Sequence, residues 1–160
     1  MLVIKKLIPF AIIILLILSV LYVIFSGKSE KTMEVPSGKE FISVQVQTIE
    51  NNKEVKSKTV TLTDKEKLDE ILRAVDGLKT KQSTITNTEK EIKDVDSYFF
   101  YFENKKERDP RKPFPYSFFI TEKGYIYYTH NAINSLDTPQ RTVKAHPDVL
   151  KKLKKITGVQ

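Results

Sequence analysis

The stretch YFFYF, at Tyr98–Phe102, decides how the domain in this chain is built. In an extended strand alternate side chains point to opposite faces, so the first, third and fifth rings share one face and the second and fourth share the other. One of these faces must belong to the core. The other face is either covered by a further element, which makes this the central strand of a sheet, or it is a tyrosine-rich surface.

Downstream of this strand, Ser117–Thr121 and Tyr125–Thr129 flank a turn at Glu122-Lys123-Gly124, which predicts a hairpin. Twelve of the sixteen Phe and Tyr residues lie between Tyr98 and Tyr128. Tyrosine combines an apolar ring with a polar hydroxyl, which suits binding surfaces. The candidate binding face comprises Tyr98, Tyr101, Tyr125, Tyr127 and Tyr128.

The segment Asn104–Pro115 connects the strand at Tyr98–Phe102 to this hairpin. It reads NKKERDPRKPFP and carries five cations against two acids. A basic segment of this kind can attract a polyanion, and it can equally be a solvated connection between strands. The candidate polyanion contacts are Lys105, Lys106, Arg108, Arg111 and Lys112.

Upstream, Phe41–Ile49 alternates apolar and polar residues, and Val55–Leu62 returns after a polar turn, which predicts a first hairpin. Thr63 then begins a helix, because Thr63 and Glu66 have the spacing of a capping box. The apolar stripe of this helix consists of Leu68, Ile71, Leu72 and Val75, and Gly77 ends it.

Lys79–Val95 is a long polar connection, in which Ser83–Thr86 is a candidate short edge strand. A connection of this length is uncommon in a compact domain unless it is functional or contains an element of its own. Asp94 and Asp96 lie near its end, but two carboxylates without a glycine-containing loop are a weak metal signal. We therefore expect no metal site.

The chain closes with a candidate short strand at Arg141–Lys144 and a helix that has Pro147 in its first turn. The buried stripe of this helix consists of Val149, Leu150, Leu153 and Ile156, and lysines occupy its other face. Basic amphipathic helices can lie on anionic membranes, but a docked helix with a solvated lysine face is the plainer interpretation.

These elements predict an α+β domain at 41–160, in which an antiparallel sheet of about five strands carries two helices on one face. The predicted order of elements is β-β-α-β-β-β-α. The domain is long enough to bury a core without a disulfide or a metal.

A run of nineteen residues without a charge, LIPFAIIILLILSVLYVIF, occupies Leu7–Phe25. As a helix it would cover roughly 28 Å, close to the ~30 Å hydrocarbon core of a bilayer. We therefore predict a short leader at 1–6, an N-terminal transmembrane helix at Leu7–Phe25 and a flexible tether at 26–40. A cleavable signal peptide is the alternative, although its apolar run is usually shorter.

The orientation of this anchor is not decided by lysines, because Lys5 and Lys6 on one side are balanced by Lys28, Lys31 and Lys39 on the other. The leader is too short to form a domain. We therefore expect a single-pass signal anchor in the cell membrane, with the C-terminal domain outside the cytoplasm.

Composition excludes several classes of site. The chain has no cysteine, which excludes disulfides, zinc–thiolate sites, a thiol nucleophile and a lipoprotein cysteine. Its two histidines, His130 and His146, fit no metalloprotease pattern, and no phosphate-binding or nucleophile-elbow motif is present. We expect no cofactor. The formal net charge of +7 favours anionic surfaces, but a domain outside the cytoplasm is not expected to meet nucleic acid.

The stretch TLTDKEKLDEIL at Thr61–Leu72, followed by Leu78-Lys79-Thr80, Ser83 and the aromatic strands, resembles a family of small uncharacterised envelope domains of Gram-positive bacteria. The resemblance covers roughly Thr59–Ile156. Members are carried behind a lipoprotein signal or a single membrane anchor, and this chain lacks the lipoprotein cysteine. The resemblance implies an envelope location and supplies no activity or catalytic residue.

The sequence therefore predicts a membrane-anchored, non-catalytic binding or accessory module of the cell envelope. Its partner would be an envelope polyanion, a peptide or a membrane protein. One alternative is an envelope hydrolase whose active site uses scattered carboxylates or His130. Another is a small regulatory subunit that pairs through its transmembrane helix.

Overall fold

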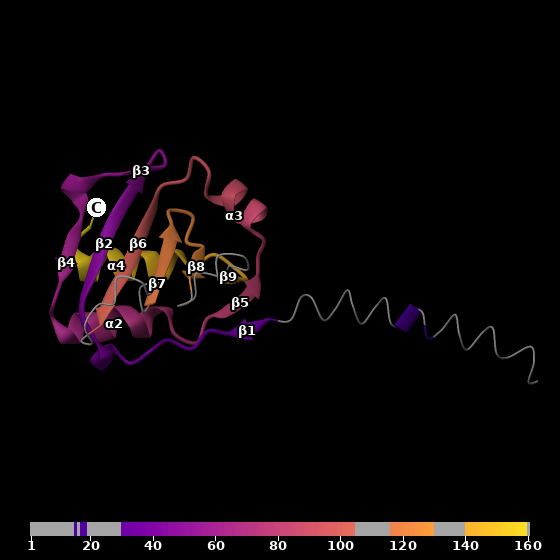
Figure 1. The fold of residues 1–160 in the computed structure, drawn as a ribbon, viewed down its shortest axis with the longest axis horizontal. Coiled ribbons are helices and arrows are strands. Elements are labelled where there is room, and N and C mark those ends of the chain that lie inside the picture. Colours follow the sequence, from indigo (N-terminus) through magenta and orange to yellow (C-terminus); the bar gives the residue numbers. More distant parts are fainter. Residues whose placement is uncertain (1–14, 16, 19–29, 105–115, 130–139, 160) are drawn as a thin grey trace, which may run out of the picture.

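The computed structural model describes residues 15, 17–18, 30–104, 116–129 and 140–159. It confirms an α+β architecture built on one antiparallel sheet (Figure 1). The strands are β1 Lys31–Thr32, β2 Phe41–Glu50, β3 Lys53–Glu54, β4 Val60–Leu62, β5 Lys79–Gln82, β6 Ser97–Asn104, β7 Tyr116–Thr121, β8 Ile126–Thr129 and β9 Gln140–Thr142.

Within the described residues the sheet has nine strands, so the prediction of about five was wrong. Its order is β1-β5-β9-β8-β7-β6-β2-β3, and β4 also pairs with β2. The strands that were missed are two to four residues long and mostly polar. Such strands bury too few side chains to show an alternating pattern, and only their partners in the sheet define them.

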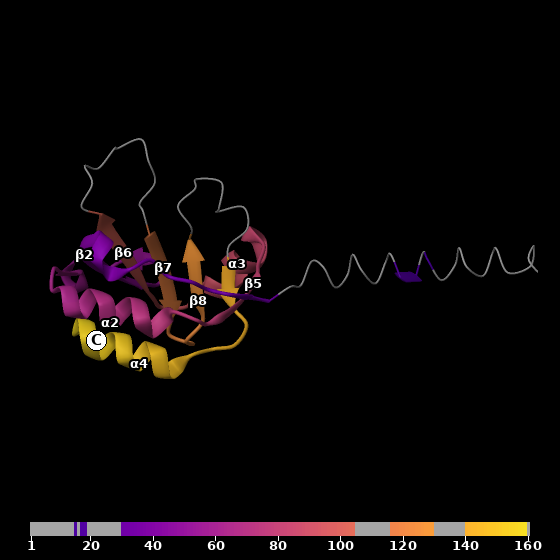
Figure 2. The same ribbon diagram turned by 90° about the horizontal axis from the view of Figure 1, so that it is seen from below.

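The helices are α2 Lys65–Val75, α3 Ile85–Ile92 and α4 Pro147–Thr157, with two 3-10 turns, η1 Gly38–Glu40 and η2 Lys56–Lys58. Figure 2 shows α2 and α4 together on one face of the sheet, as predicted for these two helices. The cap of α2 is Asp64 rather than Thr63, because the Asp64 carboxylate accepts the backbone N–H groups of Glu66 and Lys67.

The aromatic strand β6 lies inside the sheet, between β2 and β7. Four residues that lie opposite one another on neighbouring strands form a row on the sheet face that is covered by α2 and α4. They are Val46, Phe100, Phe118 and Tyr128. All four are buried, and the rings of Phe100 and Phe118 stack with centroids 4.7 Å apart. The hydrophobic core therefore lies between this sheet face and the two helices.

The long polar connection contains two elements that were not predicted, the strand β5 and the helix α3. The expected edge strand at Ser83–Thr86 is instead the start of α3, whose cap is Thr84. The Thr84 hydroxyl accepts the backbone N–H of Asn87. The sequence conceals α3 because it is short and none of its residues is fully buried.

The predicted tether at 26–40 also differs from the structure, which places residues 31–40 in the domain. Strand β1 pairs with β5, and Met33 is 5% exposed within the core. The Met33 N–H donates to the carbonyl of Leu78 at 2.9 Å, and the Gly77 N–H donates to the carbonyl of Met33 at 2.9 Å. Residues 26–29 lie outside the described part.

The predicted membrane anchor, Leu7–Phe25, also lies outside the described residues, apart from Leu15, Ile17 and Leu18. Within the described ranges, none of the helices combines the length and the apolar character needed to span a bilayer.

Candidate functional site

The five tyrosines of the predicted binding face do not form one exposed surface. Tyr98 and Tyr128 point into the helix-covered core, whereas Tyr127 belongs to the opposite face and is only 1% exposed. The Tyr128 hydroxyl donates to the carbonyl of Val75 at 2.7 Å, and burial raises its pKa. Tyr101 and Tyr125 are half-buried.

Tyr98 is held at the border of the core by two charged side chains. Its hydroxyl donates to the carboxylate of Glu122 at 2.6 Å, and Lys154 Nζ lies 4.9 Å from the centre of its ring. Lys154 also pairs with Glu122 at 3.0 Å. Burial raises the pKa of Glu122, but the hydrogen bonds from Tyr98 and Lys154 outweigh it and leave the pKa below its ordinary value.

On the opposite face, Tyr127, Glu91 and Arg141 form a cluster that we call the α3 clamp. The Tyr127 hydroxyl donates to one carboxylate oxygen of Glu91 at 2.6 Å, and the Arg141 guanidinium pairs with the other. Arg141 also lies over the ring of Tyr125, 4.4 Å from its centre. The clamp joins α3 to strands β8 and β9, and sequence reasoning missed it because α3 was not predicted.

The clamp keeps its carboxylate ionised. Burial raises the pKa of Glu91, but the hydrogen bonds from Tyr127 and Arg141 and the charge of Arg141 outweigh it, so the pKa is lowered overall. Burial and the bond to Glu91 raise the pKa of Tyr127. A hollow of about 460 Å³, the α3 pocket, opens beside the clamp between β5, β9 and α3. Its lining includes Lys81, Ser83, Asn87, Glu91 and Arg141.

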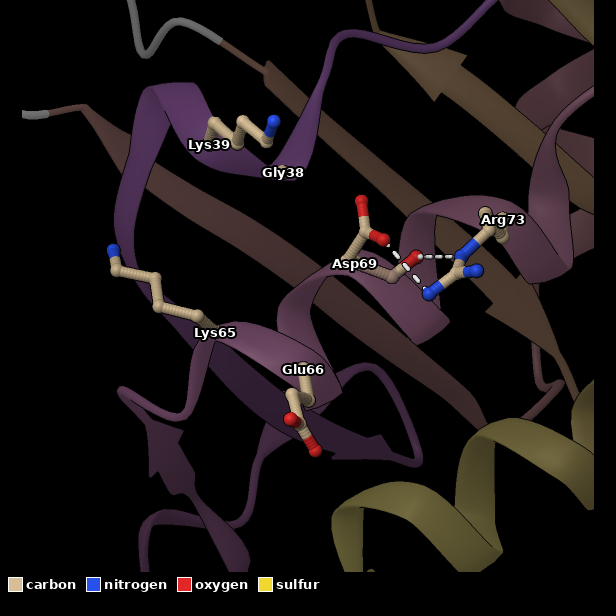
Figure 3. A pocket seen from close by; sticks show the side chains of 6 residues that line it. All are labelled: Gly38, Lys39, Lys65, Glu66, Asp69 and Arg73. Carbon is tan, nitrogen blue, oxygen red and sulfur yellow. Dashed lines mark hydrogen bonds and ion pairs between the residues drawn. The ribbon is translucent and has the colours of Figure 1, made fainter.

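A second hollow, the η1–α2 pocket, has a volume of about 420 Å³ (Figure 3). Its lining comprises Gly38, Lys39, Lys65, Glu66, Asp69 and Arg73. Figure 3 shows Lys39 reaching in from η1, and the other charged side chains projecting from α2. The pocket therefore depends on how closely η1 packs on α2.

Gly38 permits this close packing. A Cβ atom at Gly38 would lie 3.0 Å from both the Cα and the Oδ1 of Asp69, closer than the two elements can accommodate without moving. The backbone of Gly38 is also buried. A glycine in a predicted tether gave no reason to expect this contact, although the nearby apolar residues Met33 and Val35 were a weak signal of an extended, half-buried segment.

The charges of the η1–α2 pocket are only partly paired. Arg73 pairs with Asp69 at 2.7 Å, and its Nε also donates to the Asp69 carbonyl at 3.4 Å. The Lys65 ammonium donates to the carbonyl of Phe41. Among the described residues no carboxylate forms an ion pair with Lys39 or Lys65, so two ammonium groups beside this hollow lack an acidic partner.

A third surface lies between α2 and α4, where hollows of about 420 and 570 Å³ are lined by exposed charges. Lys152 pairs with Glu70 across this surface at 3.8 Å. Both side chains are about half exposed, and ion pairs of this kind contribute little energy. This surface is a solvated seam between the helices.

The remaining predicted residues divide into two groups. The polyanion candidates Lys105, Lys106, Arg108, Arg111 and Lys112, together with His130, lie outside the described residues. His146 occupies the N-cap position of α4 without a side-chain capping bond, and burial lowers its pKa. Within the described ranges no group of three or more Asp, Glu or His side chains could hold a metal ion. Asp96 instead accepts the backbone N–H of Asn51 at 3.2 Å.

Comparisons with protein-family models, with curated protein sequences and with solved structures found no match to this chain.

Proposed function

We propose that this protein is a non-catalytic binding module of the cell envelope and that its η1–α2 pocket holds an anionic group of an envelope polymer. In this proposal Leu7–Phe25 anchors the chain in the cell membrane, and the domain lies outside the cytoplasm. The observation that carries the proposal is the pair of lysines at this pocket, Lys39 and Lys65, whose charges are not used in ion pairs among the described residues.

The positions of these lysines suit a phosphate group. Lys65 stands in the first turn of α2, where its side chain is exposed. The Asp64 carboxylate already caps the N–H groups of Glu66 and Lys67, so the positive charge at this position is that of the Lys65 ammonium itself. Lys39 projects from η1 and Lys65 from α2, so the two ammonium groups come from different elements, and in Figure 3 they point in different directions. The Lys65 ammonium donates to the Phe41 carbonyl, so contact of both lysines with one anion requires their side chains to rotate. Asp69 and Arg73 add an acceptor and donors for the hydroxyl groups of a polymer that carries the phosphate.

Glu91 and Glu122 do not have the pKa shift of a general acid. A general acid needs a pKa raised toward neutrality. The two described carboxylates with displaced pKa values, Glu91 and Glu122, are both shifted downward by hydrogen bonds and by cations. Each therefore acts as an ionised acceptor in a structural contact.

The proposed site can be tested by titrating the full chain, held in nanodiscs of zwitterionic lipid, with an oligomer of glycerol phosphate. Isothermal calorimetry would measure the affinity, with polyglycerol as the uncharged counterpart. We expect K39A/K65A to weaken binding by at least about tenfold, since it removes two charge-assisted contacts. The matched control, K53A/K56A, removes two exposed lysines from β3 and η2 and should bind as the unchanged protein does.

Two results would overturn the proposed site: binding that survives K39A/K65A within twofold, or equal binding of polyglycerol. The proposed location has its own test, in which protease is added to intact, wall-stripped cells and a C-terminal tag is followed. Cleavage of the tag while a cytoplasmic control survives is the expected result. A protected tag would place the domain on the inner side of the membrane and would contradict the envelope location.

A further inference from the structure

We infer that the end of the sheet formed by β1, β5 and α3 docks on the anionic headgroups of the membrane that carries the proposed anchor. This inference rests on the membrane anchor of the proposed function. It adds a second interaction surface, which is separate from the η1–α2 pocket and binds a different partner.

The first step of the argument is the length of the connection. Strand β1 begins at Lys31, and the predicted anchor ends at Phe25, so five residues separate them. A fully extended chain spans at most about 3.3–3.6 Å per residue, so β1 lies within roughly 20 Å of the hydrocarbon boundary. The fifteen-residue tether expected from sequence would have allowed a reach of roughly 50 Å.

The second step is that β1 is firmly attached to the domain. Lys31 and Thr32 pair with Thr80 and Lys79 of β5, and the side chain of Met33 is buried immediately after them. The Thr80 hydroxyl also donates to the Lys31 carbonyl at 3.2 Å. Because this segment is fixed by both hydrogen bonds and burial, it cannot lengthen the connection without losing core contacts.

The third step identifies the elements that lie at the same end of the sheet as β1. Figures 1 and 2 both place α3 beside β5 and β9, at the end of the sheet where β1 begins. In the opposite direction, the chain after β1 runs along the domain to η1 (Figure 1). A short connection to a membrane therefore brings β1, β5 and α3 to the headgroups and leaves the η1–α2 pocket farther away.

The fourth step concerns the charged side chains at this end of the sheet. Glu30 and the elements β1, β5, β9 and α3 carry five cations, Lys31, Lys79, Lys81, Lys90 and Arg141, against three carboxylates, Glu30, Glu89 and Glu91. Arg141 already neutralises Glu91 within the α3 clamp, and Lys79 lies 3.8 Å from Glu30. The remaining lysines are exposed and can approach anionic lipid.

An apolar side chain accompanies these lysines. Ile85, at the start of α3, is 43% exposed, which is unusual for a large aliphatic residue of this domain. An exposed aliphatic side chain beside lysines suits the boundary between headgroups and acyl chains. The far end of the sheet also carries lysines, on β3 and η2, so charge alone does not select the docking surface. The short connection to the anchor selects it.

The absence of cysteine allows a direct test, because one introduced cysteine can be labelled without background. T86C on α3 and S57C on η2 replace exposed hydroxyl residues at the two ends of the sheet. Six inter-strand steps of roughly 4.8 Å separate β5 from β4, the strand that follows η2, or about 29 Å in total. Each full-length variant would carry a nitroxide label in nanodiscs whose headgroups chelate nickel.

In nanodiscs with about 30% anionic lipid, we expect nickel relaxation of the label to be at least about threefold stronger at position 86 than at position 57. In zwitterionic nanodiscs the ratio of the relaxation at position 86 to the relaxation at position 57 should fall. The double substitution K31Q/K81Q in the T86C background should also lower it, whereas K53Q/K56Q should leave it unchanged. Equal relaxation at the two positions in anionic nanodiscs would contradict the proposed docking. A ratio that is the same in anionic and zwitterionic nanodiscs would also contradict it.

Flotation of the same samples separates the two proposals. If the protein does not float with the nanodiscs after urea treatment, the anchor fails, and the docking inference fails with it. If the protein floats but the two labels relax equally, the docking inference alone is overturned and the anchor stands.

Discussion

The α3 pocket and the η1–α2 pocket are similar in size, but they use their charges differently. In the α3 pocket, Arg141 is mostly buried and is engaged by Glu91, by the Tyr125 ring and by the Thr142 carbonyl. In the η1–α2 pocket, Lys39 and Lys65 are exposed and have no described carboxylate partner. Paired, buried charge fixes the position of an element, whereas exposed charge without an acidic partner remains available to a ligand.

The largest expected effect is that of R141A, which tests whether the α3 clamp is structural. It removes the packing of the guanidinium on the Tyr125 ring and its hydrogen bond to the Thr142 carbonyl as well as the pair with Glu91, so it should lower the free energy of unfolding by about 2 kcal/mol. Urea unfolding followed by tyrosine fluorescence would measure it, since the chain has no tryptophan. The control K81A, at an exposed lysine of the same pocket, should stay within about 0.5 kcal/mol. A similarly small loss for R141A would remove the distinction between the two pockets.

G38A tests the η1–α2 pocket by forcing its two elements apart. The added Cβ meets Asp69, so we expect a loss of about 1–2 kcal/mol of stability and weaker binding of the glycerol phosphate oligomer. The control G77A strains a glycine with φ of +70° but has open space around its Cβ. It should lose about 1–2 kcal/mol of stability and keep its affinity. Unchanged affinity in G38A would show that the pocket does not bind the oligomer.

The pH dependence of the α3 clamp is the next smaller effect. The pKa of Glu91 is lowered in the folded protein, so its stabilisation is present above the ordinary glutamate pKa of about 4.3 and is lost as the pH falls through the lowered value. At pH 7, E91Q should cost less than about 1 kcal/mol, because solvent screens this partly exposed group. The difference in free energy of unfolding between E91Q and the unchanged protein should shrink in acid. A difference that stays constant from pH 7 to pH 3 would contradict an ionised Glu91.

The smallest expected effect on stability is that of K39A and K65A. Both lysines are exposed and lack described ion pairs, so each substitution should change the free energy of unfolding by less than about 0.5 kcal/mol. The same variants should weaken binding of the oligomer. A loss of stability equal to that of R141A would mean that these lysines are structural, and the contrast between the pockets would disappear.

The fold was predictable where local patterns are long. The helices α2 and α4 each carry an apolar stripe, and β2 and β6 are eight residues or more, so their periodicity is clear from sequence. The polar elements β1, β5 and α3 were not predictable, because partners distant in sequence hold them in place. Thr80 of β5, for example, is buried between Lys31 of β1 and Thr142 of β9.

The candidate site was less predictable than the fold. Tyr127 and Tyr128 look equivalent in sequence, yet the first holds α3 through Glu91 and the second supports α2 through the Val75 carbonyl. Both hydroxyls are held by partners at least 36 residues away. A tyrosine-rich segment therefore indicated a packed sheet and did not identify a binding surface.

By itself the sequence determined the α+β class, the two helices on one sheet face and the central aromatic strand, because side-chain periodicity dictates which face of each element is buried. Only the tertiary structure decided that residues 31–40 belong to the domain, that Gly38 brings η1 against α2, and that Arg141 meets Glu91. These contacts join polar or small residues far apart in the chain, and such pairs leave no periodic signal. Their positions follow from the packing of the whole domain.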